Sequence, residues 1–462
     1  MIELDPVMTY DLVIHARRAI LSGKEIACSI GIRNGKIVAI DDLSSRLKAG
    51  STVTLAEDCV LLPGLIDSHV HICEPGNTAW EGFASATRAA AAGGITTLID
   101  MPLDSVPTTV TLAALQAKQG AAASQCYVDV GFWGGAIPTN LADFEALHAA
   151  GVFGFKCFLC DTGTDDFPGI TPAHLEDVLA KTAQLGTILL VHAESAEAMA
   201  QAPNYSGNDY HKYLATRPRA QENIAIAQII QAARTTGGRA HVLHLSSSDA
   251  LPMIAAARRE RIAVSVETCP HYLSLCAEEI NAIGTSAKVG PPIREKANQD
   301  VLWNAFAQGD LAMVVSDHSP CTPDMKCLDS GDFGAAWGGI SSLQLSLPLT
   351  WSGASSRGFQ LADVVRWMAE SPAQVAGLEA KGRIAVGYDA DFCVFAPDQT
   401  FVVEGQRLHH RHPITPYIGR QLRGVVRETI LRGRSVDVSG TPFGELLVRS
   451  DARPKILNRE VA

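Results

Sequence analysis

The sequence predicts an α/β fold, namely a (β/α)8 barrel of the TIM type with a small β-sandwich domain formed from both chain ends. Short apolar runs rich in Val, Ile, Leu and Phe alternate with Ala-rich, helix-compatible stretches, which is the rhythm of a parallel sheet. Eight such runs occur, and polar residues repeatedly end them, as at the functional face of a barrel. An open doubly wound sheet would share the rhythm, but no G-x-G-x-x-G follows the first run.

Composition limits the class of protein. The chain has 462 residues, 47% of them hydrophobic, so it can bury a large core. Its formal net charge is −11 and its Lys and Arg residues are scattered, which argues against a nucleic-acid or membrane partner. The opening MIELDPVMTYDLVIHARR lacks a signal-peptide pattern, and no run approaches the roughly 20 apolar residues of a membrane span. We therefore expect a cytoplasmic protein with a small-molecule ligand.

The predicted domains follow from where the rhythm changes. Residues 1–60 are expected to form the N-terminal part of the small β domain, since short β-like runs alternate there with turns such as RNGK. Residues 61–375 would form the barrel. Residues 376–462 would complete the small β domain through GRIAVGYDADFCVF and add a tail, for which the sequence supports no function.

The predicted barrel strands are LLPGLIDSHVHI, GITTLIDMPL, YVDVGFWGGA, FGFKCFL, TILLVHAES, AHVLHLSSS, IAVSVETCPHY and AMVVSDHSP. The predicted helices include 87–92, 223–234 and 249–259. This alternation of strand and helix is the basis for a parallel barrel.

The eleven cysteines are an odd number spread through apolar segments, which indicates reduced, buried thiols rather than a disulfide framework. Cys157 and Cys160 form a C-x-x-C, but they lie in a β-like run. Positions three apart on a strand point to opposite faces. A redox or zinc site at this pair is therefore not expected.

The segment DSHVHICEPG contains the strongest local signal. His69 and His71 are two residues apart on the first predicted strand, so their side chains project to one face, as a metal site requires. Asp67 shares that face. The pair lies at the carboxyl end of the strand, where barrel active sites form.

Lys156 stands in the middle of the apolar run GFKCFL. An unpaired ammonium buried there would cost several kcal/mol, so something must neutralise it. One alternative is a salt bridge to a carboxylate of the barrel. The other is carboxylation by CO2, which converts the amine into a carbamate able to bridge two cations.

Three further strand ends each supply a residue of a metal-ligand type: His192, His244 and Asp317. Each alone would more commonly be a core or rim residue. Together with the first three they form a set of four histidines, one lysine and one aspartate at strand ends, which favours a metal centre.

Three other histidines are less suited to be ligands. His241 lies three residues before His244 and so faces the other way, which indicates a structural role. His271, in ETCPHYL, and His318, beside Asp317, are expected near the pocket as groups that orient the ligands.

At these residues the chain resembles the cyclic amidohydrolases, the family that contains allantoinase, dihydroorotase, dihydropyrimidinase and hydantoinase. The resemblance runs from about residue 10 to about residue 438. It implies that His69, His71 and Asp317 hold the more buried of two divalent ions, that His192 and His244 hold the more exposed one, and that carboxylated Lys156 bridges them. Zinc is the expected metal, although these ligand types also suit manganese, cobalt, nickel and iron.

The implied reaction is hydrolytic opening of a cyclic amide or ureide ring. A hydroxide shared by the two ions would attack a ring carbonyl, and Asp317 would act as general base and then as general acid. The segments HICEPGNTAWEGF, GFKCFL, VETCPHYL, SDHSPC, AWGGISSLQ and ITPYIGR resemble the allantoinase branch. That branch converts (S)-allantoin to allantoate in purine and ureide catabolism.

The substrate contacts are less well defined. Asp104, in MPLDSVP, stands where allantoinases carry an Asn that contacts the substrate, and Asn77 stands where Arg is common in the family. A carboxylate accepts hydrogen bonds but does not donate them when ionised. The residues at positions 104 and 77 therefore indicate either a substrate with more N–H donors or a relaxed pocket. The alternative is that Asp104 is a tolerated variant that interacts through water. Gly290 and Gly338 are expected to place backbone groups against the substrate.

Two alternative functions remain open at this stage. The first is a hydantoinase-like or dihydropyrimidinase-like hydrolase acting on another cyclic ureide or imide. The second is an inactive scaffold of the same fold, because fold does not determine function; against it, all six matching ligand positions are filled. The resemblance also suggests a homotetramer.

Overall fold

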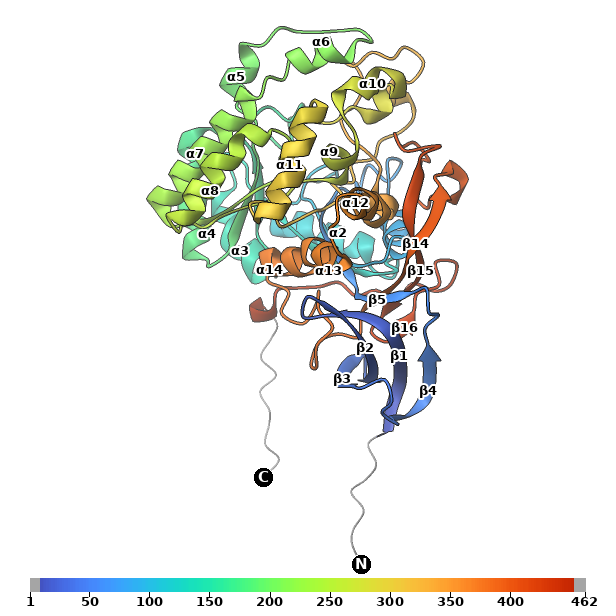
Figure 1. Cartoon of the computed structure of the whole chain (residues 1–462). Coiled ribbons are helices and arrows are strands. Elements are labelled where there is room, and N and C mark those ends of the chain that lie inside the picture. The colour runs from blue at the N-terminus through green and yellow to red at the C-terminus, as the bar shows by residue number, and fades with distance from the viewer. Residues whose placement is uncertain (1–8, 453–462) are drawn as a thin grey trace, which may run out of the picture.

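Three β-sheets organise residues 9–452, the part of the chain that the computed structural model describes (Figure 1). Residues 1–8 and 453–462, which belong to the two predicted terminal segments, lie outside the described residues. One sheet has eight strands, and two smaller sheets have five and three. The large sheet is drawn from the two chain ends, and the smaller sheets come from the middle of the chain.

The eight-stranded sheet has the order β16-β15-β14-β5-β1-β2-β3, with β4 beside β1. Its strands are β1 (Thr9–Leu21), β2 (Lys24–Arg33), β3 (Lys36–Asp41), β4 (Lys48–Thr54), β5 (Val60–Pro63), β14 (Phe392–Val402), β15 (Gln421–Leu431) and β16 (Arg434–Ser435). β5 pairs with β1 on one side and antiparallel with β14 on the other. Figure 1 shows these blue and red strands together beside the helical body.

The two smaller sheets are parallel, in the orders β13-β12-β11-β10-β9 and β6-β7-β8. Their strands are β6 (Leu65–Val70), β7 (Ile95–Asp100), β8 (Asp129–Phe132), β9 (Gly134–Gly135), β10 (Phe155–Phe158), β11 (Ile188–His192), β12 (Arg239–Val242) and β13 (Val264–Val266). Every residue of β6, β7, β10 and β11 is buried. Burial on both faces is typical of parallel strands, and the predicted α/β class is confirmed.

Helices connect and cover these strands. They are α1 (Phe83–Ala92), α2 (Leu112–Ala122), α3 (Phe144–Ala149), α4 (Pro172–Gln184), α5 (Ala196–Ala200), α6 (Tyr210–Ala215), α7 (Ala220–Thr236), α8 (Leu251–Arg259), α9 (Pro270–Ser274), α10 (Ala277–Ile283), α11 (Lys296–Gln308), α12 (Ser346–Ser355), α13 (Leu361–Val365) and α14 (Ser371–Ala376). The three predicted helices fall within α1, α7 and η2–α8 (Ser248–Arg259). Within residues 9–452, no helix is long and apolar enough to cross a bilayer.

Local signals explain where the longer helices begin and end. The Thr171 hydroxyl accepts a hydrogen bond from the N–H of His174 at the start of α4, and Pro172 occupies the first turn. α7 ends at Gly237, which has the left-handed φ of 68° that glycine adopts without strain. These helices pack their apolar faces into one large core cluster that also contains the parallel strands.

The eighth predicted strand, AMVVSDHSP, is not a regular strand, which corrects the sequence-based expectation. Among the described residues, the segment makes only isolated parallel bridges: one with Thr268 just after β13, one with Val70 at the end of β6 and one with Ile340. Asp317 has a left-handed φ of 45°. Ser316 donates its N–H to the buried carboxylate of Asp67 at 3.0 Å instead of to a strand carbonyl. The Asp67 side chain therefore takes the place of a backbone partner in the β-ladder at Ser316.

The first predicted strand also differs from expectation, because LLPGLIDSHVHI divides at Gly64 into β5 and β6. β5 joins the eight-stranded sheet and β6 joins β7. A side chain at Gly64 would overlap that of Thr96, so only glycine allows the chain to pass from one sheet to the other here.

A buried cluster of charges ties the eight-stranded sheet to β8. Lys381 Nζ lies 2.8 Å from Asp129, at the start of β8, and 2.6 Å from Asp391. It also contacts Asp389 at 3.1 Å. Arg432 donates to both oxygens of Asp129. Because the Lys381 side chain is only 7% exposed, its charge is compensated by these carboxylates rather than by water.

We expect Lys381→Ala to lower the free energy of unfolding by about 3–5 kcal/mol, because it leaves buried carboxylates without their cation. Lys36→Ala is the matched control. Lys36 pairs with Asp389 as well, but its side chain is 45% exposed, so a loss of about 1 kcal/mol or less is expected. Urea denaturation of both variants measures the difference; equal losses would show that the buried cluster adds nothing to stability.

Candidate metal centre

Side chains from neighbouring strand ends line one open cavity of about 230 Å³. The lining includes every residue that the sequence singled out for the site: His69, His71, Asp104, Lys156, His192, His244, Gly290, Asp317 and Gly338. Residues up to 269 positions apart in this set are therefore brought to one place by the parallel strands, whose carboxyl ends meet on the same side of the fold.

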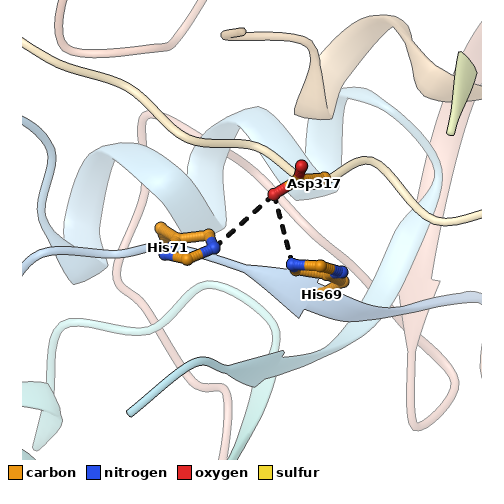
Figure 2. A group of neighbouring side chains, drawn as sticks. All are labelled: His69, His71 and Asp317. Carbon is orange, nitrogen blue, oxygen red and sulfur yellow. Dashed lines mark ion pairs between the residues drawn. The ribbon is translucent and has the colours of Figure 1, made fainter. Parts of the chain in front are cut away.

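His69, His71 and Asp317 form the first half of the cluster (Figure 2). Asp317 Oδ1 lies 3.2 Å from His69 Nε2 and 3.5 Å from His71 Nε2. His69 Nε2 is buried and makes no hydrogen bond within residues 9–452. Two imidazole nitrogens and one carboxylate oxygen thus converge, as metal ligands do.

The electrostatics of this half favour a cation. Burial lowers the pKa of His69, but the carboxylates of Asp317 and Glu267 outweigh burial and raise it to about 9. Burial raises the pKa of Asp317, but His69 and His71 hold it well below the usual aspartate value. A site that draws a proton onto a buried imidazole also attracts a metal ion to the same nitrogen.

Asp317 is aimed by its backbone and by two neighbours. Its left-handed φ of 45° turns the side chain toward β6. The N–H of Ser316 is held by Asp67, whose pKa burial raises to about 7. The Ser319 hydroxyl donates to Asp317 Oδ1 at 2.8 Å. The sequence placed Asp67 on the face of the two histidines; in the structure it instead anchors the Asp317 segment and does not line the cavity.

His192 and His244 form the second half. His192 Nδ1 and His244 Nε2 are 2.8 Å apart. The His244 ring lies 5.4 Å from that of His69, measured between centroids, so the two halves adjoin. Burial lowers the pKa of both His192 and His244, which favours the neutral form that binds metal.

Lys156 lies in β10 with 1% of its surface exposed. Within residues 9–452, no carboxylate forms a salt bridge with it and no hydrogen bond involves its Nζ, which stands 4.5 Å from the centroid of the Phe158 ring. Burial lowers the pKa of this amine. The structure thus lacks the salt bridge that was the first alternative for neutralising Lys156.

Three of the four histidines have a carboxylate on the ring nitrogen that faces away from the cluster. His69 Nδ1 lies 2.5 Å from Glu267, His71 Nδ1 lies 2.6 Å from Asp104, and His192 Nε2 lies 2.8 Å from Glu194. A carboxylate on the outer nitrogen fixes the orientation of the ring and leaves the inner nitrogen free to bind a cation, either a proton or a metal ion. This is the arrangement found around metal-binding histidines.

Glu194 and Glu267 were not predicted as functional residues. Glu194 is held by Arg217 at 3.0 Å as well as by His192, and these partners outweigh burial and lower its pKa to about 2. Glu267 likewise has a pKa of about 2, because His69 and His241 outweigh burial. A signal existed in the sequence: both are charged residues at the ends of apolar strands, where a charge needs a partner.

The three histidines assigned other roles do not line the cavity. His241 contacts Glu267 Oε2 at 3.0 Å and so supports His69 indirectly. His318, which directly follows Asp317 in the chain, contacts Glu81 at 3.1 Å. His271 is buried with no partner for either ring nitrogen within residues 9–452, and burial lowers its pKa to about 4.

The predicted substrate contacts occupy the wall of the cavity. Asp104 binds His71, and its carbonyl oxygen accepts a hydrogen bond from Asn77 at 2.9 Å. A methyl group built on Gly290 or Gly338 would come no closer than 3.8 Å to any neighbour. Neither glycine is therefore required by packing, and the missing side chains leave room in the cavity.

Two other clusters contain metal-ligand types but suit a cation less well. They are Cys160, His192 and Glu194, and Cys269, His271 and Asp317. The first adjoins the guanidinium of Arg217, which repels a cation, and the second shares Asp317 with the main cluster. Burial raises the pKa of both thiols. All eleven cysteines are free within the described chain.

The donor set therefore fits a pair of divalent cations. It combines inward-facing imidazole nitrogens, an anionic carboxylate and a buried amine that makes no salt bridge within residues 9–452, in a cavity open to a small molecule. Nitrogen and carboxylate ligands suit zinc and its neighbours in the first transition row.

Comparison with known proteins agrees with this chemistry. The model of the amidohydrolase family matches residues 60–436. The allantoinase of Streptomyces avermitilis is 50% identical, over 95% of this chain and 99% of that protein. The allantoinase of Arabidopsis thaliana is 42% identical, over 95% of this chain and 89% of that protein. The allantoinase of Saccharomyces cerevisiae is also 42% identical, over 86% of this chain and 88% of that protein.

Solved structures that resemble this chain include hydantoinases, at lower sequence identity. The L-hydantoinase (dihydropyrimidinase) of Arthrobacter aurescens superposes with a TM-score of 0.88 at 29% identity, over 95% of this chain and 98% of that one. A D-hydantoinase of Bacillus sp. AR9 gives a TM-score of 0.84 at 28% identity, over 95% and 99%.

Zinc added to the metal-free protein should raise its Tm, because an ion that binds only the folded state stabilises it. His244→Asn should remove most of this rise, since it would delete one of the predicted ligands. His241→Asn should remove less, since His241 acts only through Glu267 and such outer partners change metal affinity by about 10- to 100-fold. Equal losses in the two variants would contradict a structural role for His241.

Proposed function

The chain belongs to the amidohydrolase family, and on that basis we propose that it catalyses the hydrolysis of allantoin to allantoate. The observation that carries the proposal is the convergence of all six predicted ligands on one cavity, in a chain that is 50% identical over nearly its whole length to an allantoinase. The enzyme class is a hydrolase acting on cyclic amides. The S enantiomer is the proposed substrate.

Asp317 is proposed as the general acid and base. Its Oδ1 faces His69, in β6, and His71, just after β6, and accepts from Ser319, while the other oxygen points away from the two rings in Figure 2. That oxygen can take the proton of the attacking water and pass it to the ring nitrogen as the amide bond breaks. The low pKa of Asp317 keeps its carboxylate ionised, as a general base must be before it accepts a proton.

His69, His71 and Asp317 would hold the more buried of two divalent ions, and His192 and His244 the more exposed one. Bound divalent ions would supply a water molecule of lowered pKa and polarise the ring carbonyl. Zinc is the proposed metal. Lys156 is proposed to be carboxylated by CO2 and to bridge the two ions, a proposal supported by its burial and by the missing salt bridge.

The cavity wall suits a polar, ring-shaped substrate. Gly290 lies beside Glu194 and Arg217, and Gly338 lies against Gly290. Lys288 also lines the cavity. Backbone amides of the two glycines can reach the substrate because no side chain covers them, and the charged groups can bind its ureido atoms.

A hydantoinase-like activity on another cyclic ureide is the alternative, supported by the solved structures. Those proteins are 28–29% identical to this chain, against 42–50% for the allantoinases named above, so the alternative fits less well. An inactive scaffold is disfavoured because none of the six ligand positions is lost.

We further propose that the two parallel sheets close into one (β/α)8 barrel. Phe153, just before β10, donates its N–H to the carbonyl of Phe132 in β8 at 3.0 Å. On the other side, the irregular 312–320 segment bridges to Thr268, and His71 donates its N–H to the carbonyl of His318 at 2.9 Å. These contacts support a continuous ring of strands.

The domain division at residues 60 and 375, a homotetrameric assembly and a cytoplasmic location are proposals that accompany this function. The pairing of β5 with β14 supports a small domain made from both chain ends. Light scattering after size-exclusion chromatography measures the assembly directly.

Substrate preference tests the proposed function. Metal-reconstituted enzyme should open allantoin in preference to hydantoin, dihydrouracil and dihydroorotate, measured in parallel, because the polar wall suits the ureido group. Lys156→Ala should abolish turnover, since it removes the proposed bridge. Preference for another ring would leave the proposed hydrolysis mechanism in place but contradict allantoin as the substrate. Asp104 would then be the first residue to examine.

Gly338→Ala should fold normally and raise the KM for allantoin by about 10-fold or more, since one extra methyl group in a fitted pocket costs about 1–3 kcal/mol of binding. Its neighbour provides the control: a side chain at Gly339 would overlap the carbonyl of Ser319, so Gly339→Ala should destabilise the fold instead. Thermal unfolding and steady-state kinetics separate the two effects. An unchanged KM in folded Gly338→Ala would place the substrate elsewhere.

A further inference from the structure

Asp104 lies at the point where the cavity wall meets the metal centre proposed above. Its Oδ2 is 2.6 Å from His71 Nδ1, and its side chain is 13% exposed, toward the cavity that it lines. Of the three carboxylates on the outer nitrogens, Glu267 and Glu194 use both oxygens on protein groups. Within residues 9–452, only the Asp104 member of this set has an oxygen without a protein donor.

The backbone holds Asp104 in one orientation. Its φ is 62°, in the left-handed region, which Asp and Asn tolerate better than most residues. Asn77 donates to its carbonyl oxygen at 2.9 Å, and Val106 donates its N–H to the carbonyl of Pro75 at 2.8 Å. The loop after β7 is thereby fastened to the loop after β6. The carboxylate is aimed at His71 by this loop rather than by a flexible side chain.

The hydrogen bond between His71 and Asp104 determines which ring nitrogen of His71 can bind a metal ion. With Nδ1–H donated to Asp104, the lone pair of His71 lies on Nε2, the atom that faces Asp317 at 3.5 Å. A carboxylate partner also makes the imidazole a stronger ligand. Without it, His71 could take the other tautomer and present an N–H to the centre.

We propose that Asp104 is a positioning residue that acts through His71 and sets the affinity of the metal centre. This inference rests on the proposed function, because it presupposes that His71 binds a metal. It also accounts for a carboxylate at this position. An amide offers one acceptor and one donor group, so it holds His71 only in one of its two orientations, whereas either carboxylate oxygen accepts from Nδ1–H.

The test is zinc affinity, measured by competition with a chromophoric chelator. Asp104→Gly removes the carboxylate at a φ that glycine adopts freely, and zinc affinity should fall about 10- to 100-fold. Asp104→Asn keeps the shape and one acceptor and should show a smaller loss. Asp161→Asn is the matched control, because Asp161 lines the same cavity but accepts no hydrogen bond from a histidine; its carboxylate accepts only from Gly163 N–H in the hydrogen bonds of residues 9–452. Its zinc affinity should stay unchanged.

Kinetics separate positioning from substrate contact. If Asp104 acts through His71, excess zinc should restore part of the kcat of both Asp104 variants. If it contacts only the substrate, KM should stay raised at every zinc concentration with zinc affinity unchanged, and the inference is overturned. If Asp104→Gly unfolds at a lower temperature than the wild type in the absence of zinc, the Asp104→Asn variant provides the same test. Failure of the wild type to bind zinc would instead overturn the proposed function.

Discussion

The structure depends above all on carboxylates bound to the outer nitrogens of buried histidines. Buried imidazoles and carboxylates are costly unless they satisfy one another, and the pairs of His69 with Glu267 and of His192 with Glu194 do so at 2.5 and 2.8 Å. Because each pair uses one ring nitrogen, the other nitrogen points inward, toward the cavity. The proposed chemistry of the cavity depends on this arrangement, since inward-facing imidazole nitrogens beside the Asp317 carboxylate form a group that could hold a metal ion.

Regular strands bring these groups together, and irregular residues aim them. His244 and Asp317 have left-handed φ angles of 35° and 45°, and Asp104 has one of 62°. Each lies just beyond a buried run, at the mouth of the fold. Residues in sparsely populated backbone conformations persist only where the surroundings determine them. Here Asp67 and Asn77 supply those surroundings by binding the neighbouring backbone.

Stability and chemistry are placed at different ends of the parallel strands. Lys381 and Arg432 meet Asp129 at the start of β8, whereas His192 ends β11 and His69 lies near the end of β6. Joining the eight-stranded sheet to the strand starts leaves the opposite ends free for the cavity. This division is typical of barrel folds, in which loops at the carboxyl ends carry function.

The sequence by itself determined the parallel α/β class and the residue types of the site, because the period of apolar residues and the H-x-H spacing are local properties. It also identified Lys156 as a charge in need of compensation. It did not reveal the irregular geometry of 312–320, the break at Gly64, or the roles of Glu194 and Glu267. Only the tertiary structure decided which carboxylate serves which histidine, since His69 and Glu267 are 198 positions apart and His71 and Asp104 are 33 apart. Such pairings arise from the packing of segments that are distant in the sequence, so no local sequence pattern predicts them.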